Sequence, residues 1–339
     1  MTIREIAALA GVSPATVSMV LNGRTGIGRE TRERVQKVLA ENNYTRYSRD
    51  AEDPCCNIRF IKYSKHGMVV EENQGFISSI IDRIAAECRR FNYNLMMQGC
   101  NSSTVEETLQ AVSGNGMDGV IFLGSELDAE LTQKLLDVKV PLVVLDHSMR
   151  FTGLSSVVMA NEDIAVAAVR YLYGMGHRTI GYYHSSVVVH NFEERLSGYR
   201  IAARQLGLTE TEPICLTPTL KGAYMDMKKL LLSGAYKPEG AVFCANDTIA
   251  IGAARALQEQ GYAIPNDISM IGVDDIPFSA ITQPALTTMR VSRTLMGILV
   301  IDTLRKHILH PEWPPTNVNV IGQLVERDSV RAVTPASAC

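Results

Sequence analysis

A regular alternation of apolar and amphipathic segments between residues 58 and 273 restricts the fold of this chain more than any other feature. The apolar segments are short and rich in Val and Ile, as buried strands are. The segments between them repeat apolar residues every three or four positions, as amphipathic helices do. Apolar strands that alternate with helices predict parallel sheets covered on both faces. Nine or more strands are too many for one twisted sheet, so we expect two subdomains.

The predicted strands are Ile58–Tyr63, Tyr93–Gln98, Gly119–Leu123, Pro141–Asp146, Ser156–Met159, Thr179–His184, Ile214–Thr217, Ala241–Ala245 and Ile268–Val273. The predicted helices between them are Phe76–Phe91, Thr104–Ser113, Ala129–Asp137, Glu162–Tyr173, Phe192–Leu206, Ala223–Ser233 and Asp247–Gln260. They are followed by a segment at Leu286–Arg290, a helix at Thr294–Leu309 and a last segment at Thr316–Glu326.

A different pattern, three short helices around a small core, occupies residues 2–44. The first helix carries an apolar stripe at spacings of three and four, formed by Ile3, Ile6, Ala7 and Ala10. Gly11 permits the turn that ends it, and Ser13 is a suitable N-cap before Pro14 at the start of a second helix. The second helix turns Val17, Val20 and Leu21 inward, and a third, about Arg29–Asn43, buries Val35, Val38 and Leu39. This arrangement predicts a helix-turn-helix that reads DNA.

The charge distribution agrees with nucleic-acid binding by this segment. Residues 1–50 contain eight basic and five acidic residues, a net charge of +3, whereas the remainder contains 25 and 31, a net charge of −6. A basic segment in an acidic chain suits a phosphate backbone, although an excess this small is weak evidence alone. The alternative is a small helical cap without a ligand.

Composition and motifs exclude several other classes of protein. No run of about 18 apolar residues is present, so no membrane span is expected. The seven cysteines form no C-x-x-C, which favours reduced thiols in a cytoplasm. The run from Gly114 to Gly119 spells G-x-G-x-x-G, but it follows a helix and opens a strand, so we interpret it as a helix stop and turn and not as a dinucleotide site. No metal-ligand spacing or catalytic constellation occurs, and neither an enzyme nor a cofactor is predicted.

Candidate ligand contacts follow the predicted strands, where an open α/β sheet places its binding residues. Asp146 ends one strand, Asn246 and Asp247 follow another, and Asp274 follows a third. Asp247 is alternatively an N-cap of the next helix. Arg195 lies early on a helix, where the alternative is a plain surface charge.

Several motifs together resemble the lactose-repressor (LacI) family of bacterial transcription regulators. The headpiece motifs are A-G-V-S-x-x-T-V-S-x-V-L-N-G from Ala10, then T-R-x-R-V and N-Y. Further markers are Gly176–Arg178, Arg195–Tyr199, Asn246-Asp247, Gly272–Asp275, Pro284–Thr288 and Glu326–Ser329. The resemblance covers nearly all of residues 1–331. It implies an all-α helix-turn-helix headpiece followed by a two-lobed, periplasmic-binding-protein-like α/β domain with two parallel sheets and three crossovers.

The domain boundaries that this resemblance implies place the headpiece at 1–45 and a linker at 46–57. The first lobe takes 58–156 and 286–312, the second lobe 157–285 and 313–331, and a tail 332–339. The expected crossovers lie near 156–157, 285–286 and 312–316.

The resemblance also implies two sets of contacts. Operator DNA is expected to meet Thr2, Ser13, Pro14, Ala15, Thr16, Ser18, Met19, Asn22 and Arg24. A sugar or similar small polar effector is expected to meet Gln74, Phe76, Ser125, Asp146, Asn161, Arg195, Asn246 and Asp274, because a guanidinium, an amide and carboxylates satisfy vicinal hydroxyls. The expected protein is then a cytoplasmic, effector-controlled transcription regulator that acts as a repressor. It is expected to be a homodimer through the first lobe near Phe76–Phe91. Alternatives are a regulator controlled by a protein partner, or a free sugar-binding or sugar-modifying protein.

Two departures from the family pattern concern DNA. The linker lacks the family's Pro-Asn and A-R-x-L, so we expect no leucine wedge in the minor groove and a less kinked operator. Many family members carry an arginine where this chain has Met19. Methionine cannot make a bidentate contact to guanine, so we expect an operator without that guanine.

Overall fold

The computed structural model describes residues 3–21, 27–41, 55–70, 74–114, 116–238 and 240–333. Contacts divide the chain into two units, Met1–Pro54 and Cys55–Cys339. Most of the expected linker, and the tail from residue 334, lie outside the described residues, so the linker prediction is not tested.

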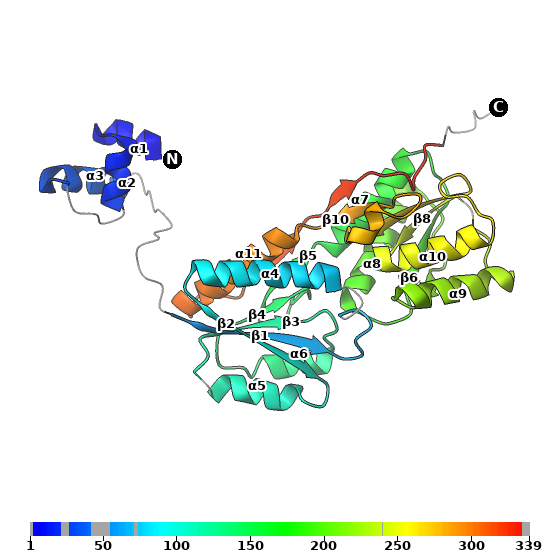
Figure 1. Cartoon of the computed structure of the whole chain (residues 1–339), viewed down its shortest axis with the longest axis horizontal. Coiled ribbons are helices and arrows are strands. Elements are labelled where there is room, and N and C mark those ends of the chain that lie inside the picture. The colour runs from blue at the N-terminus through cyan, green and yellow to red at the C-terminus, as the bar shows by residue number, and fades with distance from the viewer. Residues whose placement is uncertain are drawn as a thin grey trace. The chain divides into compact units, whose positions relative to one another are not determined.

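The N-terminal unit has the three predicted helices, α1 (Ile3–Ala10), α2 (Pro14–Leu21) and α3 (Arg29–Glu41) (Figure 1). Its core is formed by Ile6, Ala7, Ala10, Val17, Val20 and Val35, with Val38 and Leu39 partly buried against it. The turn is also as predicted. Gly11 adopts a left-handed φ of 63°, and the Ser13 hydroxyl accepts a hydrogen bond from the backbone N–H of Thr16 at 3.1 Å. The helix stop and the N-cap together define the helix-turn-helix.

The first lobe of the C-terminal unit is a six-stranded parallel sheet in the order β2-β1-β3-β4-β5-β11 (Figure 1). The strands are β1 (Asn57–Ser64), β2 (Asn94–Asn101), β3 (Gly119–Leu123), β4 (Leu142–Leu145), β5 (Ser155–Met159) and β11 (Asn317–Val320). Its helices are α4 (Gln74–Arg90), α5 (Val105–Gly114), α6 (Ala129–Leu135) and α11 (Arg293–Leu309). Alternate residues of the strands face two cores, one shared with α4 and α11 and one with α5 and α6.

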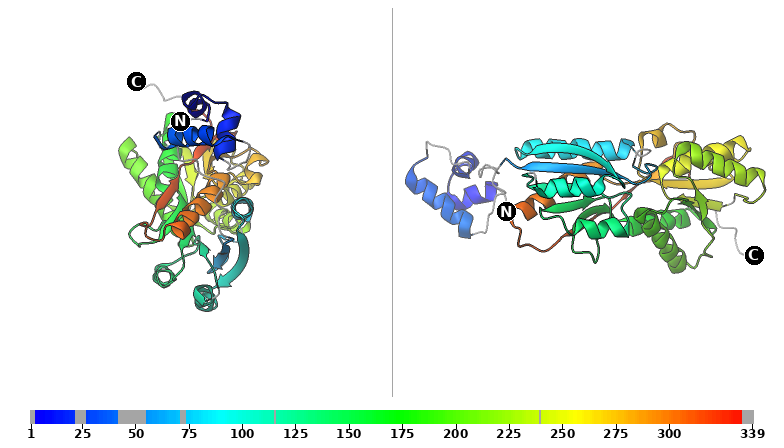
Figure 2. Two further views of the ribbon diagram at one scale, coloured as in Figure 1. Left: turned by 90° about the vertical axis from the view of Figure 1, so that its left-hand side faces the viewer. Right: turned by 90° about the horizontal axis from the view of Figure 1, so that it is seen from below.

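The second lobe has a second six-stranded sheet, in the order β7-β6-β8-β9-β10-β12. The strands are β6 (Ile180–Ser185), β7 (Ile214–Leu216), β8 (Gly240–Cys244), β9 (Ile268–Val273), β10 (Thr287–Arg290) and β12 (Gln323–Val325), and β12 alone among these pairs antiparallel. Its helices are α7 (Asn161–Gly174), α8 (His190–Leu206), α9 (Leu220–Leu232) and α10 (Asp247–Glu259). Figure 2 shows the two lobes side by side.

Glycines set the close packing of the helix pairs in the second lobe. A Cβ on Gly198 of α8 would lie 2.4 Å from the carbonyl oxygen of Glu162 on α7. A Cβ on Gly252 of α10 would lie 2.6 Å from the carbonyl oxygen of Leu220 on α9. No side chain fits at either position without moving a helix, so both pairs depend on glycine.

Three crossovers connect the lobes, and each lies further along the chain than expected. The chain leaves the first sheet after β5, returns to the first lobe between β10 and α11, and leaves it again between β11 and β12. Therefore β10, expected in the first lobe, pairs in the second sheet, and β11, expected in the second lobe, pairs in the first. Strand pairing decides the lobe to which each strand belongs, because β10 hydrogen-bonds to β9 and β11 hydrogen-bonds to β5.

The G-x-G-x-x-G run forms a helix stop and turn, as predicted. Helix α5 ends at Gly114, Gly116 has a left-handed φ of 62°, and β3 begins at Gly119. Among the described residues, no helix is both long and apolar enough to cross a membrane.

Candidate functional site

The exposed side of α2 carries most of the predicted DNA contacts that the structure describes. Ser13, Pro14 and Ala15 are exposed, and Thr16 and Met19 are partly exposed, above the buried Val17 and Val20. The hydroxyls of Ser13 and Thr16 lie 2.9 Å apart. Thr2, Asn22, Arg24 and the side chain of Ser18 lie outside the described residues.

Arg195 is the centre of the predicted effector site and is not a surface charge. Its side chain is 2% exposed, and its Nε donates a hydrogen bond to Asn161 Oδ1 at 2.9 Å. Its guanidinium also donates to the carbonyl oxygen of Ala245 and lies 3.7 Å from Asp274 Oδ1. The second lobe therefore brings together Asn161, Arg195 and Asp274 from α7, α8 and the residue after β9.

The first lobe contributes Asp146, which follows β4 and has a left-handed φ of 64°. Ser125 donates to Asp146 Oδ2 at 2.5 Å. Asn191 of the second lobe donates through Nδ2 to both the carbonyl oxygen of Asp146, at 3.0 Å, and its Oδ1, at 3.1 Å. Burial raises the pKa of Asp146 to about 6, although Ser125 and the nearby Arg195 favour its ionised form. Asp146 and Asn191 thus join the two lobes at the site.

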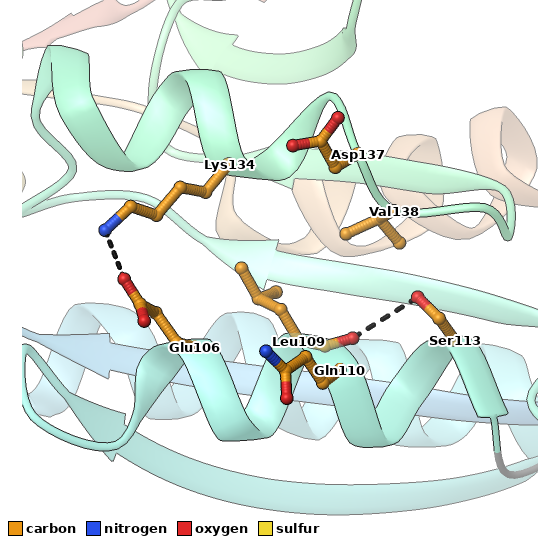
Figure 3. Close-up of a pocket in the computed structure, with 7 residues that line it drawn as sticks. All are labelled: Glu106, Leu109, Gln110, Ser113, Lys134, Asp137 and Val138. Atoms are coloured by element: carbon orange, nitrogen blue, oxygen red, sulfur yellow. Dashed lines mark hydrogen bonds and ion pairs between the residues drawn. The ribbon is translucent and has the colours of Figure 1, made fainter.

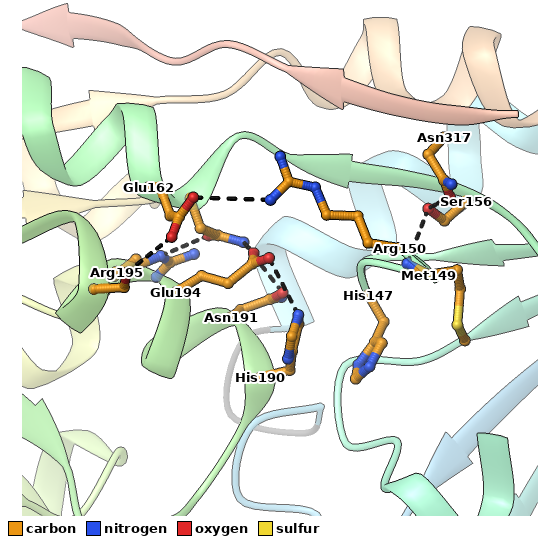
Figure 4. A network of polar contacts seen from close by, with 12 residues as sticks. His147, Met149, Arg150, Ser156, Glu162, His190, Asn191, Glu194, Arg195 and Asn317 are labelled. Atoms are coloured by element: carbon orange, nitrogen blue, oxygen red, sulfur yellow. Dashed lines mark hydrogen bonds and ion pairs between the residues drawn. The ribbon is translucent and has the colours of Figure 1, made fainter. Parts of the chain in front are cut away.

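The network extends through residues that the sequence did not single out (Figure 4). Asn161 Nδ2 donates to Asn191 Oδ1 at 3.2 Å and to Glu194 Oε2 at 3.0 Å. His190 lies 3.1 Å from Glu194 and stacks on His147 of the other lobe, with ring centroids 4.6 Å apart. Burial, and then the neighbouring His190, lower the pKa of His147 to about 4. Helical spacing could have identified Asn191, because it lies one turn before Arg195 on the same helix.

The remaining predicted effector residues have local structural partners. Asn246 caps α10, since its Oδ1 accepts from the backbone N–H of Ile249 at 2.9 Å. The alternative interpretation of Asp247 as that cap is therefore wrong. Asp247 instead accepts hydrogen bonds from Ser279 at 2.6 Å and Thr288 at 2.6 Å, and burial raises its pKa to about 7.

Two predicted residues lie at the start of α4. Phe76 is 1% exposed and packs in the first-lobe core. Gln74 is the first residue of the helix, and its side chain lies outside the described residues. Phe76 is therefore a core residue of the first lobe.

A surface pocket of about 290 Å³ lies elsewhere, between α5 and α6 of the first lobe (Figure 3). It is lined by Glu106, Leu109, Gln110, Ser113, Lys134, Asp137 and Val138. Lys134 bridges Glu106 and Glu130 at its edge, at 2.5 Å and 2.9 Å. None of the predicted effector residues lines it, so it is distinct from the site between the lobes.

Comparisons with known proteins agree with both units. Residues 2–46 match the model of bacterial regulatory proteins of the lacI family, and residues 169–330 match a periplasmic binding protein-like domain. The chain is 30% identical to the HTH-type transcriptional repressor PurR of Vibrio cholerae serotype O1, over 98% of this chain and 99% of that protein. It is 31% identical to the ribose operon repressor of Haemophilus influenzae, over 91% and 92% of the two chains.

Solved structures show the same fold. A complex of the transcriptional regulator CelR with cellobiose matches with a TM-score of 0.71 and 25% identity, over 97% of this chain and 99% of that one. A lac repressor dimer bound to operator and an anti-inducer matches with a TM-score of 0.72 and 23% identity, over 98% and 99%.

A helix-turn-helix unit joined to a two-lobed α/β unit with a buried polar network between its lobes defines a ligand-responsive transcriptional regulator. The chain belongs to the LacI family of bacterial regulatory proteins. The two relatives named above are transcriptional repressors.

Proposed function

We propose that this chain is a dimeric repressor that binds operator DNA through α2 and responds to an uncharged, polyhydroxylated effector held between the lobes. The observation that carries the proposal is the Arg195–Asn161–Asp274 cluster of the second lobe beside the Asp146–Asn191 bridge to the first. Guanidinium and amide N–H groups donate hydrogen bonds, and carboxylates accept them, so hydroxyls find both kinds of partner here.

The charges at the site favour a neutral ligand. Asp146, Asp274 and Glu194 are carboxylates around the cation Arg195, and at the edge of the same network a second cation, Arg150, lies 3.9 Å from a fourth carboxylate, Glu162 (Figure 4). A phosphate or carboxylate on the ligand would be buried beside these acids, at a cost in Coulomb energy that a hydroxyl does not have. An effector that replaces the Asp146–Asn191 contacts would change the placement of one lobe on the other, and with it the affinity for DNA.

A thermal-shift and DNA-binding screen tests this effector class. We expect a neutral sugar from a panel that includes ribose and cellobiose to raise the melting temperature of the parent and to change its operator affinity. The phosphorylated or carboxylated form of the same sugar serves as the matched control and should do neither. A charged form that binds more tightly than the neutral sugar would contradict the charge argument.

The exposed side of α2 supports a second part of the proposal. Met19 is a partly exposed apolar side chain beside the exposed Pro14 and Ala15, which suits contact with a thymine methyl better than with guanine. Selection of duplexes from random DNA should therefore return half-sites without a guanine at the step facing residue 19. The variant Met19→Arg should select guanine there, and identical sites for parent and variant would show that this residue does not read a base.

The dimer contact is proposed for the first lobe near α4. Strand β2 is an edge strand beside α4 and exposes the apolar residue Met97, which is 49% exposed. An exposed apolar side chain on a sheet edge is a suitable contact for a second copy. Light scattering should report a dimer, and a stable monomer at micromolar concentration would contradict the proposal.

A further inference from the structure

The loop after β1 wraps around a single buried carboxylate, that of Glu126. One oxygen of Glu126 accepts hydrogen bonds from the backbone N–H groups of Lys65, His66 and Gly67, at 2.7, 2.9 and 3.1 Å. The other accepts from Val69 at 2.9 Å and Val70 at 3.1 Å. Glu126 is 3% exposed. Five backbone donors of one loop therefore depend on one side chain.

The carboxylate must be ionised for this arrangement. Burial alone would raise the pKa of Glu126, but the backbone hydrogen bonds from the loop outweigh it and the pKa is lowered overall. Both oxygens of Glu126 accept hydrogen bonds, and an ionised carboxylate is a side-chain group with two acceptor oxygens and no donor. A glutamine would turn an NH2 group toward backbone N–H groups, which are themselves donors.

The residues beside Glu126 contact the first-lobe half of the effector site. The carbonyl oxygen of Gly124 accepts a hydrogen bond from His147 Nδ1 at 3.1 Å, and Ser125 donates to Asp146 at 2.5 Å. A Cβ on Gly124 would lie 2.9 Å from Val144, so the chain can pass this closely only without a side chain. Three consecutive residues at the end of β3 thus hold Asp146, His147 and the loop after β1.

We propose that Glu126 is a positioning residue of the effector site. Its carboxylate holds the loop of residues 65–70 at the carboxyl ends of the first-sheet strands, where Ser125 and Asp146 lie. The inference rests on the proposed function, because it assigns the loop a role in the binding of the same neutral polyhydroxylated effector. The loop that Glu126 holds in place is also fixed at both ends. Lys65 at one end pairs with Asp128 at 2.8 Å, and Val70 at the other end is fully buried in the core.

The test compares Glu126→Gln with Glu130→Gln, a control on α6 whose carboxylate is 81% exposed and pairs with Lys134. Hydrogen exchange of the amides of residues 65–70 should accelerate at least tenfold in Glu126→Gln and remain unchanged in the control. Affinity for ribose or cellobiose, whichever the parent binds, should weaken at least tenfold in Glu126→Gln, while operator affinity without sugar stays within twofold. A purely structural role would lower the melting temperature without this selective loss of sugar affinity.

Each outcome decides the matter. Unchanged loop exchange, or accelerated exchange with parental sugar affinity, overturns the inference while the proposed function stands. If the parent protein binds neither sugar, the proposed effector class is contradicted, and the positioning role of Glu126 fails with it. If Glu126→Gln does not fold, Glu126→Asp replaces it, since the charge is kept and the reach is shortened, and the same selective loss of sugar affinity is expected.

Discussion

Replacement of Arg195 by methionine tests whether the buried guanidinium organises the second lobe. Methionine keeps an unbranched side chain but removes the hydrogen bonds to Asn161, at 2.9 Å, and to the Ala245 carbonyl, and the charge 3.7 Å from Asp274. Asp274 is 3% exposed and would lose the cation beside it. Removal of one partner of a buried ion pair costs about 3–5 kcal/mol in unfolding free energy.

The expected result is a large fall in the melting temperature of the two-lobed unit. Each kcal/mol corresponds to about 2–4 °C for a domain of this order of size, so Arg195→Met should melt about 10 °C below the parent. Arg200→Met on the same helix is the control, because Arg200 is 47% exposed and lies 3.9 Å from Glu210. An exposed pair of this kind contributes at most about 1 kcal/mol.

Calorimetry or circular dichroism measures both variants, and a thermal shift with the effector follows for Arg195→Met. The reasoning is refuted if Arg195→Met melts within about 2 °C of the parent. It is also refuted if the melting temperature of Arg200→Met falls by as much as that of Arg195→Met. Retained effector binding in Arg195→Met would separately remove Arg195 from the site.

Two further predictions concern the lobe contact and the helix packing. The folded pKa of His147, about 4, lies below its unfolded value of 6.5, so the stability advantage of the parent over His147→Gln should be present above pH 6.5 and shrink as the pH falls toward 4. Chemical denaturation of both proteins at several pH values measures the difference between their unfolding free energies. The pH dependence that Asp146 contributes runs in the opposite direction, but both proteins share it and it drops out of the difference. A difference that is constant between pH 7.5 and 5 would contradict the prediction. Gly198→Ala should destabilise by about 1–3 kcal/mol through overpacking against α7, whereas Gly181→Ala, whose Cβ would meet no atom closer than 3.9 Å, should be tolerated. Equal melting temperatures for these two variants would show that α7 and α8 separate at little cost.

The sequence by itself determined the features that depend on neighbouring residues. The bounds of β3 and β9 were predicted to the residue, because a short apolar run between turn residues specifies a buried strand locally. The end of α1 at Gly11 and the cap at Ser13 follow from the conformational freedom of glycine and the reach of a serine hydroxyl. Asp274 was predicted to be a ligand contact from its place after a strand, and Arg195 from the resemblance to the family.

Only the tertiary structure decided which distant residues meet. The sheet to which β10 and β11 belong depends on hydrogen bonds to β9 and β5, and no local pattern encodes those partners. The pairing of Asn191 with Asp146 joins residues from different lobes, and Glu126 holds a loop some sixty positions earlier in the chain. A polar side chain acquires such a role when folding buries it, because it then has to find its hydrogen-bond partners among whatever groups the topology places beside it.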